Sequence, residues 1–374
     1  MEQSAKLRVA VLFGGRSTEH EVSMTSAIGV LKHINREKYD VLPVRISKEG
    51  RWIMLNDPQS LKTADDLETR EGKMLVLGGP KIKGFFKMST AAGDEKGVGL
   101  ERVPVDVVFP ILHGTFGEDG TLQGALAMAD LPCVGGGVMA SAVGMDKVMM
   151  KQIFFQNDLS GTEYIWFLRK DWIKHRGPIV KAICDEIQFP CFIKPANTGS
   201  SVGVNKAHDE KELLQFIDLA CEYDRKVLVE KAVNARELEC SVLGNDEPET
   251  SVVGEIIPCK EFYDYEAKYL LERSEIVIPA DIPVAMAEQL QKLAISAYKA
   301  LDCAGMARVD FLMDKTSKQI YVNEINTIPG FTPISMYPKL WEATGVSYSE
   351  LIDRLIELAI ERHEDLGRSR FLHE

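Results

Sequence analysis

The sequence predicts an α/β protein of three domains, the first of which contains a parallel, Rossmann-like sheet. Apolar runs typical of buried strands alternate with helical segments, as in sheets whose parallel strands are joined by helices. The chain has 374 residues, and a single hydrophobic core rarely grows beyond about 250–300 residues. Three consecutive glycines at 135–137 then place the end of the first domain at residue 137.

Residues 1–137 supply the elements of the first domain. The apolar run at 7–13 ends in two glycines, so we predict a buried parallel strand that enters a tight turn. A helix is expected over residues 22–34. Further strands are expected over 41–46 and 105–112, with a helix over 122–129. The polar, Gly-rich stretch from 58 to 102 has weak periodicity, which indicates a variable excursion with irregular strands.

The second domain is predicted over residues 138–230 and the third over 231–374. In the second we expect a long helix over 139–157, strands over 191–194 and 227–230, and a helix over 210–223. The third has strand-like runs at 237–243 and 251–258, a polar-aromatic segment at 259–274 and a helix at 283–301. A capping box of Ser347 and Glu350 begins the terminal helix. Its apolar stripe, which we expect to pack in the core, is Leu351, Ile352, Leu355, Ile356 and Ala359.

The composition argues against several classes of protein. The net charge is −12, whereas a nucleic-acid-binding protein normally presents a basic face. No secretory signal pattern begins the chain, and no apolar run approaches the roughly 20 residues of a membrane span. The seven cysteines form no Cys-x-x-Cys pair, so we interpret them as reduced core thiols. We therefore expect a cytoplasmic protein with no nucleic-acid or membrane partner.

Hard oxygen ligands follow two strand-like runs near the C-terminus. Asp310 ends one run, and Glu324 and Asn326 end the next. Glu324 and Asn326 are two residues apart, so on a strand their side chains share a face. Together the three can hold Mg²⁺, which prefers carboxylate and carbonyl oxygens. Arg308 precedes Asp310 by two residues, where its guanidinium suits developing negative charge beside a metal.

A glycine- and serine-rich turn lies between two strand-like runs at residues 194–203. Backbone N–H groups and hydroxyls, including those of Ser200 and Ser201, can wrap a phosphate in such a turn. Lys194 adds a positive charge at the end of its strand. The chain contains neither a P-loop nor a Gly-x-Gly-x-x-Gly fingerprint. An ordinary flexible hairpin is the alternative, and the predicted metal ligands further along the chain favour the phosphate site.

The apolar run at 227–233 breaks into a charged pair, Glu230 and Lys231, before Val233. The backbone at a strand edge can read the donor and acceptor of adenine, and Glu237 can accept from ribose hydroxyls. The spacing supports a solvated strand end equally well.

Two further motifs follow buried strands of the first domain. Residues 14–23 form a strand–turn–helix entry in which Glu19 can bind a substrate ammonium. Acidic residues are also common at the start of a helix for reasons of capping alone. His113 and the glycines after it follow the other strand. Open α/β sheets bind ligands at this end of their strands, so His113 is a candidate site residue.

These motifs, in this order, resemble those of the D-alanine–D-alanine ligases of the ATP-grasp superfamily, and the resemblance extends over roughly residues 7–364. It is weakest after residue 58. The motifs that carry it lie at residues 14–23, 113–120, 145–147, 194–203, 262–269 and 323–332.

The resemblance implies a three-domain ATP-grasp architecture with ATP between the second and third domains. It implies that two D-alanines and ATP give D-alanyl-D-alanine, ADP and phosphate for peptidoglycan synthesis, and hence for cell-wall biogenesis and cell shape. Lys147 and Lys194 would contact ATP phosphates, while Glu237 would take the ribose. The adenine would lie along Glu230, Lys231 and Val233. Two Mg²⁺ ions, with Mn²⁺ as a substitute, would be held by Asp310, Glu324 and Asn326.

The resemblance also implies roles around the substrates. Glu19 would bind the ammonium of the first D-alanine, and Ser335 would meet the carboxylate of the second. Ser200 and Tyr269 would form a hydrogen-bonded triad with Glu19. Lys268 would reach the γ-phosphate from a lid at 259–274, and Arg308 would stabilise the tetrahedral oxyanion. The Lys268–Tyr269 pair matches ligases that use an amine rather than lactate as the nucleophile.

Two other functions compete with this one. Another ATP-grasp ligase would act on a different amino acid, which the motifs around Glu19 and Ser335 disfavour. A non-catalytic nucleotide-binding scaffold would keep the fold and lose a metal ligand or the arginine, and this sequence retains Asp310, Glu324, Asn326 and Arg308. The family resemblance further suggests a homodimer.

Overall fold

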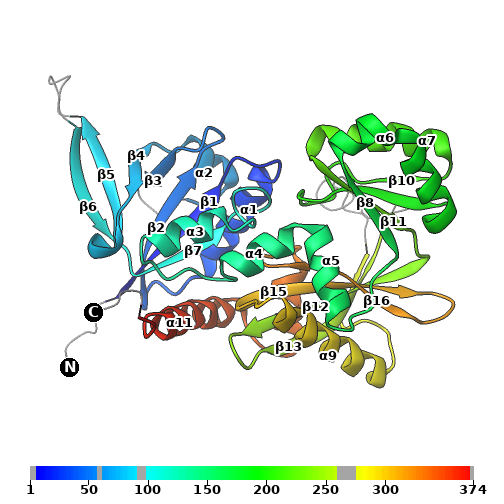
Figure 1. The fold of residues 1–374 in the computed structure, drawn as a ribbon. Helices are drawn as coiled ribbons and strands as arrows, with labels where there is room; N and C mark the ends of the chain where they lie inside the picture. Colours follow the sequence, from blue (N-terminus) through cyan, green and yellow to red (C-terminus); the bar gives the residue numbers. More distant parts are fainter. Residues whose placement is uncertain (1–5, 57–60, 91–97, 259–274, 371–374) are drawn as a thin grey trace.

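The computed structural model describes residues 6–56, 61–90, 98–258 and 275–370, and within them the strands form three sheets (Figure 1). The first sheet has the order β6-β5-β4-β3-β2-β1-β7, the second β10-β9-β11-β8 and the third β14-β13-β12-β15-β16. Each sheet therefore comes from one continuous part of the chain, as the predicted succession of three α/β units requires.

The centre of the first sheet is parallel, as predicted. Strand β1 (Leu7–Gly14) pairs in parallel with β2 (Tyr39–Ile46) and β7 (Val107–Ile111), and helix α1 (His20–His33) follows β1. Val9 to Phe13 are fully buried. The carboxyl ends of β1 and β7 meet at one edge of the sheet, where the two candidate loops begin.

The prediction of an irregular excursion after residue 58 was wrong. These residues extend the sheet with regular antiparallel strands beyond β3 (Trp52–Leu55). The added elements are α2 (Ala64–Thr69), β4 (Gly72–Leu77), the 3₁₀ turn η1 (Pro80–Ile82), β5 (Gly84–Thr90) and β6 (Val98–Pro104). Leu75 is buried between the exposed Met74 and Val76. Because apolar residues also lie on the solvent face, these strands lack the alternation of apolar and polar residues by which a strand is identified in the sequence.

The long helix predicted over 139–157 is two helices. After α3 (Thr121–Met128), α4 (Val138–Met145) ends at Asp146 and α5 (Lys147–Gln156) begins there. Asp146 has an extended backbone, and its carboxylate accepts hydrogen bonds from the N–H groups of Val148 and Met149, both at 3.1 Å. A capping aspartate therefore starts a new helix.

The second sheet is antiparallel and carries its helices on one side (Figure 1). The predicted helix α7 (Glu210–Tyr223) and strands β9 (Cys191–Pro195) and β11 (Lys226–Lys231) are present. Elements that the sequence reading missed are β8 (Tyr164–Leu168), α6 (Arg169–Ala182), the π-helical turn η2 (Ile183–Ile187) and β10 (Asn205–Ala207).

The third sheet is also antiparallel. Its strands are β12 (Ala235–Gly244), β13 (Glu249–Ile257), β14 (Glu275–Val277), β15 (Gly305–Asp314) and β16 (Ile320–Asn326). Its helices are α9 (Val284–Ala300), α10 (Met336–Thr344) and α11 (Tyr348–Leu366). Met150 and Phe154 of α5 pack in the core of this sheet, while Val148 of the same helix packs on Ala196 and Leu228 of the second sheet region. Helix α5 therefore bridges the two sheets.

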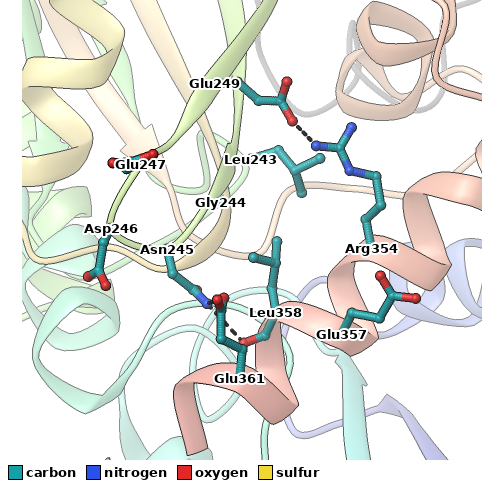
Figure 2. A pocket seen from close by; sticks show the side chains of 10 residues that line it. All are labelled: Leu243, Gly244, Asn245, Asp246, Glu247, Glu249, Arg354, Glu357, Leu358 and Glu361. Atoms are coloured by element: carbon teal, nitrogen blue, oxygen red, sulfur yellow. Dashed lines mark hydrogen bonds and ion pairs between the residues drawn. The ribbon is translucent and has the colours of Figure 1, made fainter. Parts of the chain in front are cut away.

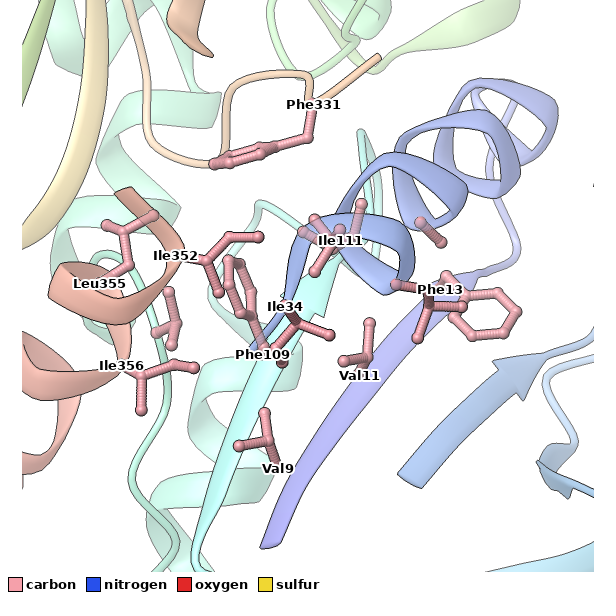
Figure 3. Close-up of a cluster of buried hydrophobic side chains, with 14 of the residues drawn as sticks. Val9, Val11, Phe13, Ile34, Phe109, Ile111, Phe331, Ile352, Leu355 and Ile356 are labelled. Carbon is pink, nitrogen blue, oxygen red and sulfur yellow. The ribbon is translucent and has the colours of Figure 1, made fainter. Parts of the chain in front are cut away.

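The terminal helix α11 packs against the first sheet (Figure 3). Ser347 caps it by accepting a hydrogen bond from the N–H of Glu350. The predicted apolar stripe is buried, and Ile352 and Ile356 share a core with Val9 and Phe109. The last helix of the chain therefore closes the core of the first sheet.

The six cysteines in the described part of the chain are free thiols, as predicted. Burial raises the pKa of Cys133, Cys191, Cys240 and Cys303 to about 12, so these thiols are uncharged at neutral pH. None of the described helices is both long enough and apolar enough to cross a bilayer.

Candidate active site

The two strands that carry the predicted metal ligands are neighbours. Strands β15 and β16 are antiparallel, with Arg308 opposite Asn326 and Asp310 opposite Glu324. The Nε and Nη2 groups of Arg308 donate to the two carboxylate oxygens of Asp310, each at 2.7 Å. The amide Nδ2 of Asn326 donates to Asp310 Oδ2 at 3.0 Å. Pairing of the strands thus brings all four residues together.

A third strand adds a carboxylate beside Arg308. Glu239 of β12 lies opposite Asp310, and its Oε2 is 2.9 Å from Arg308 Nε. Burial alone would lower the pKa of Arg308, but the charges of Asp310 and Glu239 raise it well above its ordinary value. The guanidinium is therefore a fixed, permanent positive charge.

The donor set fits a hard divalent cation. Asp310, Glu324 and Asn326 offer two carboxylates and an amide oxygen, and the bond to Asp310 uses only the nitrogen of the Asn326 amide. Oδ1 of Asp310 accepts a hydrogen bond from Arg308, and Oδ2 accepts from both Arg308 and Asn326. No group of three or more histidine, cysteine, aspartate or glutamate side chains in the described ranges is arranged to hold a metal, so this mixed set is the candidate.

Lys194 and Glu230 form a buried pair next to the third sheet. Glu230 is 1% exposed, and its Oε1 forms an ion pair with Lys194 Nζ. The other oxygen, Oε2, is 2.9 Å from Lys151 Nζ and accepts a hydrogen bond from Thr162 Oγ1 at 3.0 Å. Burial would raise the pKa of Glu230, but Lys151 and Lys194 outweigh it and lower that pKa. Burial would likewise lower the pKa of Lys194, but Glu230 outweighs burial and raises it.

The glycine-rich turn is shaped by unusual backbone angles. Ser200 and Ser201 have φ values of 46° and 58°, in a region that L-residues seldom occupy. Lys147 Nζ donates to the carbonyl oxygen of Thr198 in this turn at 2.6 Å, and the N–H of Lys147 bonds Ala196 O at 3.0 Å. Helix α5 therefore fixes the base of the turn and places the first predicted phosphate lysine beside it.

Glu19 joins the first sheet to this turn. It precedes α1, is buried, and accepts a hydrogen bond from Ser200 Oγ. A Cβ at Gly114 or Gly199 would collide with its carboxylate and displace it, and the φ of 73° at Gly114 also favours glycine. The predicted partners Glu19 and Ser200, which are distant in the sequence, are in direct contact.

His113 follows β7 and lies inside the protein. Its Nδ1 is 3.2 Å from the carbonyl oxygen of Ile328 and 3.4 Å from Glu118 Oε1, while Nε2 is 3.1 Å from Ser26 Oγ. Burial would lower its pKa, but the hydrogen bond and charge of Glu118 raise it overall. The loop after β16 is thereby fastened to the first sheet, and Ser26 also accepts from the N–H of Phe331 at 3.2 Å.

Ser335 lies on the same loop, immediately before α10. Its hydroxyl accepts a hydrogen bond from the N–H of Thr332 at 3.0 Å and is 2.8 Å from Thr332 Oγ1. These bonds tie Ser335 to the turn immediately before α10.

The remaining predicted residues are Lys231, Val233, Glu237, Lys268 and Tyr269. Lys231 is exposed and pairs with Glu163 at 2.9 Å, and Val233 is half-buried. Glu237 lies on β12, and its charge helps to raise the pKa of Lys194. Lys268 and Tyr269 lie outside the described residues, as does the segment predicted to form a lid.

Several contacting residues were not on the predicted list, among them Ser26, Glu118, Lys151, Thr162 and Glu239. Lys151 is four residues after Lys147 and so lies on the same face of α5. Glu239 is two residues after Glu237 on a strand. Both spacings are visible in the sequence, although neither identifies the partner.

A separate cavity of about 360 Å³ lies between the turn after β12 and helix α11 (Figure 2). Arg354 forms an ion pair with Glu249 there, and Asn245 Nδ2 donates to Glu361 Oε2 at 2.6 Å. Its lining residues are Leu243, Gly244, Asn245, Asp246, Glu247, Glu249, Arg354, Glu357, Leu358 and Glu361. This set contains none of the predicted site residues.

Comparisons with known proteins identify the family. The family model described as D-ala D-ala ligase N-terminus matches residues 8–136, and the one described as D-ala D-ala ligase C-terminus matches residues 153–357. A D-alanine–D-alanine ligase of Acetivibrio thermocellus is 48% identical over 368 residues, which is 96% of this chain and 97% of the relative. One from Chloroherpeton thalassium is 48% identical over 363 residues, covering 96% and 98%.

Solved structures extend the likeness to the fold. The D-alanine–D-alanine ligase of Coxiella burnetii superposes with a TM-score of 0.84 at 33% identity, covering 98% of this chain and 97% of the other. The VanG D-Ala:D-Ser ligase of Enterococcus faecalis gives a TM-score of 0.83 at 36% identity, covering 95% and 100%. This likeness supports the predicted ATP-grasp architecture. By the family models and by these near-full-length relatives, the chain belongs to the D-alanine–D-alanine ligase family.

Proposed function

We propose that this protein joins two D-alanine molecules at the expense of ATP and forms D-alanyl-D-alanine, ADP and phosphate for peptidoglycan synthesis. The contact between Glu19 and Ser200 carries the proposal, because it joins a candidate ammonium site to the glycine-rich phosphate turn. Arg308 and Asp310 supply the positive charge and the metal ligand that acyl transfer from a phosphate requires.

ATP would lie between the second and third sheets. Lys147, which bonds the turn at Thr198, and Lys194, which pairs with Glu230, would neutralise its phosphates, with Ser200 and Ser201 in the turn. We assign the base to the strand end formed by Glu230, Lys231 and Val233, and the ribose to Glu237. The family is ATP-dependent, so ATP and a divalent metal are expected.

Asp310, Glu324 and Asn326 would hold the metal, for which we propose two Mg²⁺ ions, with Mn²⁺ as a substitute. Bound there, the ions would neutralise the oxygens of the transferring phosphoryl group. Arg308 is kept in place by Asp310 and Glu239, so its charge is already oriented before substrates bind. Such preorganised charge costs no rearrangement when negative charge develops.

In the proposed reaction, a carboxylate oxygen of the first D-alanine attacks the γ-phosphorus of ATP and ADP leaves. The amine of the second D-alanine then attacks the activated carbonyl carbon. The C–O bond to phosphate breaks, and the amine loses a proton. Glu19 would bind the ammonium of the first D-alanine, Ser335 the carboxylate of the second, and Arg308 the tetrahedral oxyanion.

We assign Lys268 to the γ-phosphate and Tyr269 to the hydrogen-bonded triad with Glu19 and Ser200. This pair favours an amine over a hydroxyl as the nucleophile. We further propose the division 1–137, 138–230 and 231–374 for the domains, a cytoplasmic location and a homodimer.

The proposal is tested by phosphate release from ATP in the presence of single amino acids. We expect activity with D-alanine and none with L-alanine. Competition among D-alanine, D-serine and D-lactate near neutral pH then identifies the second substrate, and the dipeptide of D-alanine should dominate the products. Predominant depsipeptide would overturn the assignment of the nucleophile, and ATP turnover that ignores D-alanine would overturn the function.

A further inference from the structure

Lys151 binds the same carboxylate, that of Glu230, as Lys194 of the proposed nucleotide site. Lys151 of α5 is 5% exposed, and its Nζ is 2.9 Å from Glu230 Oε2 and 3.2 Å from Thr162 Oγ1. Thr162 Oγ1 donates its own proton to Glu230 Oε2 at 3.0 Å. One oxygen of Glu230 is thus compensated entirely from within the protein.

The other oxygen of Glu230 pairs with Lys194, whose side chain is 14% exposed and therefore more accessible than that of Lys151. Two ammonium groups consequently share one carboxylate. Lys151 lies on its more buried side, and Lys194 lies on the side of the proposed nucleotide site. The cluster carries a net positive charge that Glu230 and Lys194 alone would lack.

This arrangement matters when Lys194 has to reach a phosphate. A buried carboxylate with a single cationic partner holds that partner tightly, because losing it leaves an uncompensated buried charge. With Lys151 and Thr162 on its second oxygen, Glu230 remains compensated when Lys194 turns toward the nucleotide. The cost of releasing Lys194 is therefore lower with Lys151 than without it.

We infer that Lys151 is a positioning residue of the nucleotide site, which acts through Glu230 to keep Lys194 available for ATP phosphates and to keep Glu230 ionised. This inference rests on the proposed function. An ionised carboxylate only accepts hydrogen bonds. Adenine presents an amino group at C6 and guanine a carbonyl oxygen, so the charged Glu230 also favours ATP over GTP.

Helix α5 holds Lys151 in this position. Lys147, one turn earlier, is bound through its N–H to Ala196 O at 3.0 Å, and Val148 packs on Ala196 and Leu228. The helix is therefore attached to β11, the strand that carries Glu230, and to the residue that follows the neighbouring strand β9. A lysine four residues after Lys147 lies on the same face of α5 and reaches the carboxylate from behind.

The test is steady-state kinetics of Lys151→Met, with Lys174→Met on the exposed face of α6 as the matched control and Lys151→Arg as the conservative variant. We expect Lys151→Met to raise the KM for ATP about 10-fold or more, as for a lost charge-assisted interaction. The KM for D-alanine should stay within about 3-fold and the preference for ATP over GTP should fall. Lys151→Arg should recover part of the loss, and Lys174→Met should behave as wild type.

A double-mutant cycle separates this role from a purely structural one. In Glu230→Gln there is no carboxylate to compensate, so adding Lys151→Met should change the KM for ATP by less than about 3-fold. Additive effects, an unchanged KM for ATP, or equal rises in both KM values would overturn the inference. If Lys151→Met does not fold, Thr162→Val removes the neighbouring hydrogen bond at nearly constant shape and should raise the KM for ATP by about 3-fold.

Measurements on the wild-type protein distinguish a failure of the proposed function from a failure of the role assigned to Lys151. Absence of D-alanine-dependent phosphate release in the wild type would count against the proposed function. Normal wild-type activity combined with an unaltered KM for ATP in Lys151→Met would count against the role of Lys151 alone. Direct titration with a fluorescent ATP analogue measures the nucleotide affinity independently of turnover.

Discussion

Arg308 shows how single residues prepare the site. Two carboxylates from neighbouring strands, Asp310 and Glu239, hold its guanidinium at distances of 2.7–2.9 Å. The planar guanidinium donates to both oxygens of Asp310 at once, which a lysine ammonium could not reproduce. The same bonds fix the orientation of Asp310, so the arginine and the candidate metal ligand are ordered together.

Glu324 gives a direct test of the metal assignment. Replacing it with glutamine keeps the shape of the side chain and removes one of the two carboxylate charges that would face the proposed cation. We expect Glu324→Gln to abolish turnover while the melting temperature stays close to that of the wild type. Phosphate release and thermal unfolding check both parts, with Glu342→Gln on the exposed side of α10 as the control. Near-normal activity in Glu324→Gln would refute the assignment.

His113 predicts a dependence of stability on pH. Its folded-state pKa is raised above the ordinary 6.5, because Glu118 and, less strongly, the charge of Glu19 outweigh burial. A raised pKa contributes stability that is fully present below pH 6.5 and is lost as the pH rises through the folded-state pKa. The difference in melting temperature between wild type and His113→Gln should therefore be largest near pH 6 and shrink toward pH 9.

The comparison for this prediction is His175→Gln on the exposed face of α6, which should follow the wild type at every pH. A constant difference between wild type and His113→Gln across this range would contradict the assigned protonation.

At the scale of elements, the sequence was informative wherever one face of an element is buried. The terminal helix was predictable because its five apolar residues repeat with helical spacing, and α7 has the predicted bounds. Strands β4 to β6 were missed because apolar residues also lie on their solvent face. Asp146 was read as part of a helix, since the two helices around it have compatible patterns and only the cap separates them.

The cap at Asp146 has a measurable consequence. Its carboxylate accepts two N–H groups at the start of α5 and forms an ion pair with Lys226. Asp146→Ala should destabilise the protein by about 1 kcal/mol or more, because losing a capping side chain typically costs 0.5–2 kcal/mol. Asp146→Asn keeps the acceptor for the cap and should lose less. Thermal unfolding of both variants checks the order, and equal losses would show that the ion pair, not the cap, dominates.

At the scale of the whole molecule, the packing of the sheets creates contacts that no local sequence pattern predicts. Period-two spacing predicted that Glu324 and Asn326 share a face, whereas the contacts Glu19–Ser200 and Lys151–Glu230 join parts of the chain with no local relation. Such contacts arise only after the sheets pack together. The candidate site therefore lies where the three sheets meet, and its geometry depends on helices α5 and α11, which each pack against a sheet outside their own stretch of sequence.

The packing of α11 leads to a prediction about the isolated first sheet. Ile352, Leu355 and Ile356 fill a core with Val9 and Phe109, and none of these side chains is appreciably exposed (Figure 3). A fragment of residues 1–137 would expose this apolar face, since burying one such side chain contributes about 1.5–3 kcal/mol. We expect the fragment to bind a hydrophobic dye and to melt without a cooperative near-ultraviolet transition, in contrast to the full chain. A peptide of residues 346–368 should reduce the dye binding, because it restores the missing helix. Cooperative melting of the fragment alone would show that the first sheet folds independently of α11.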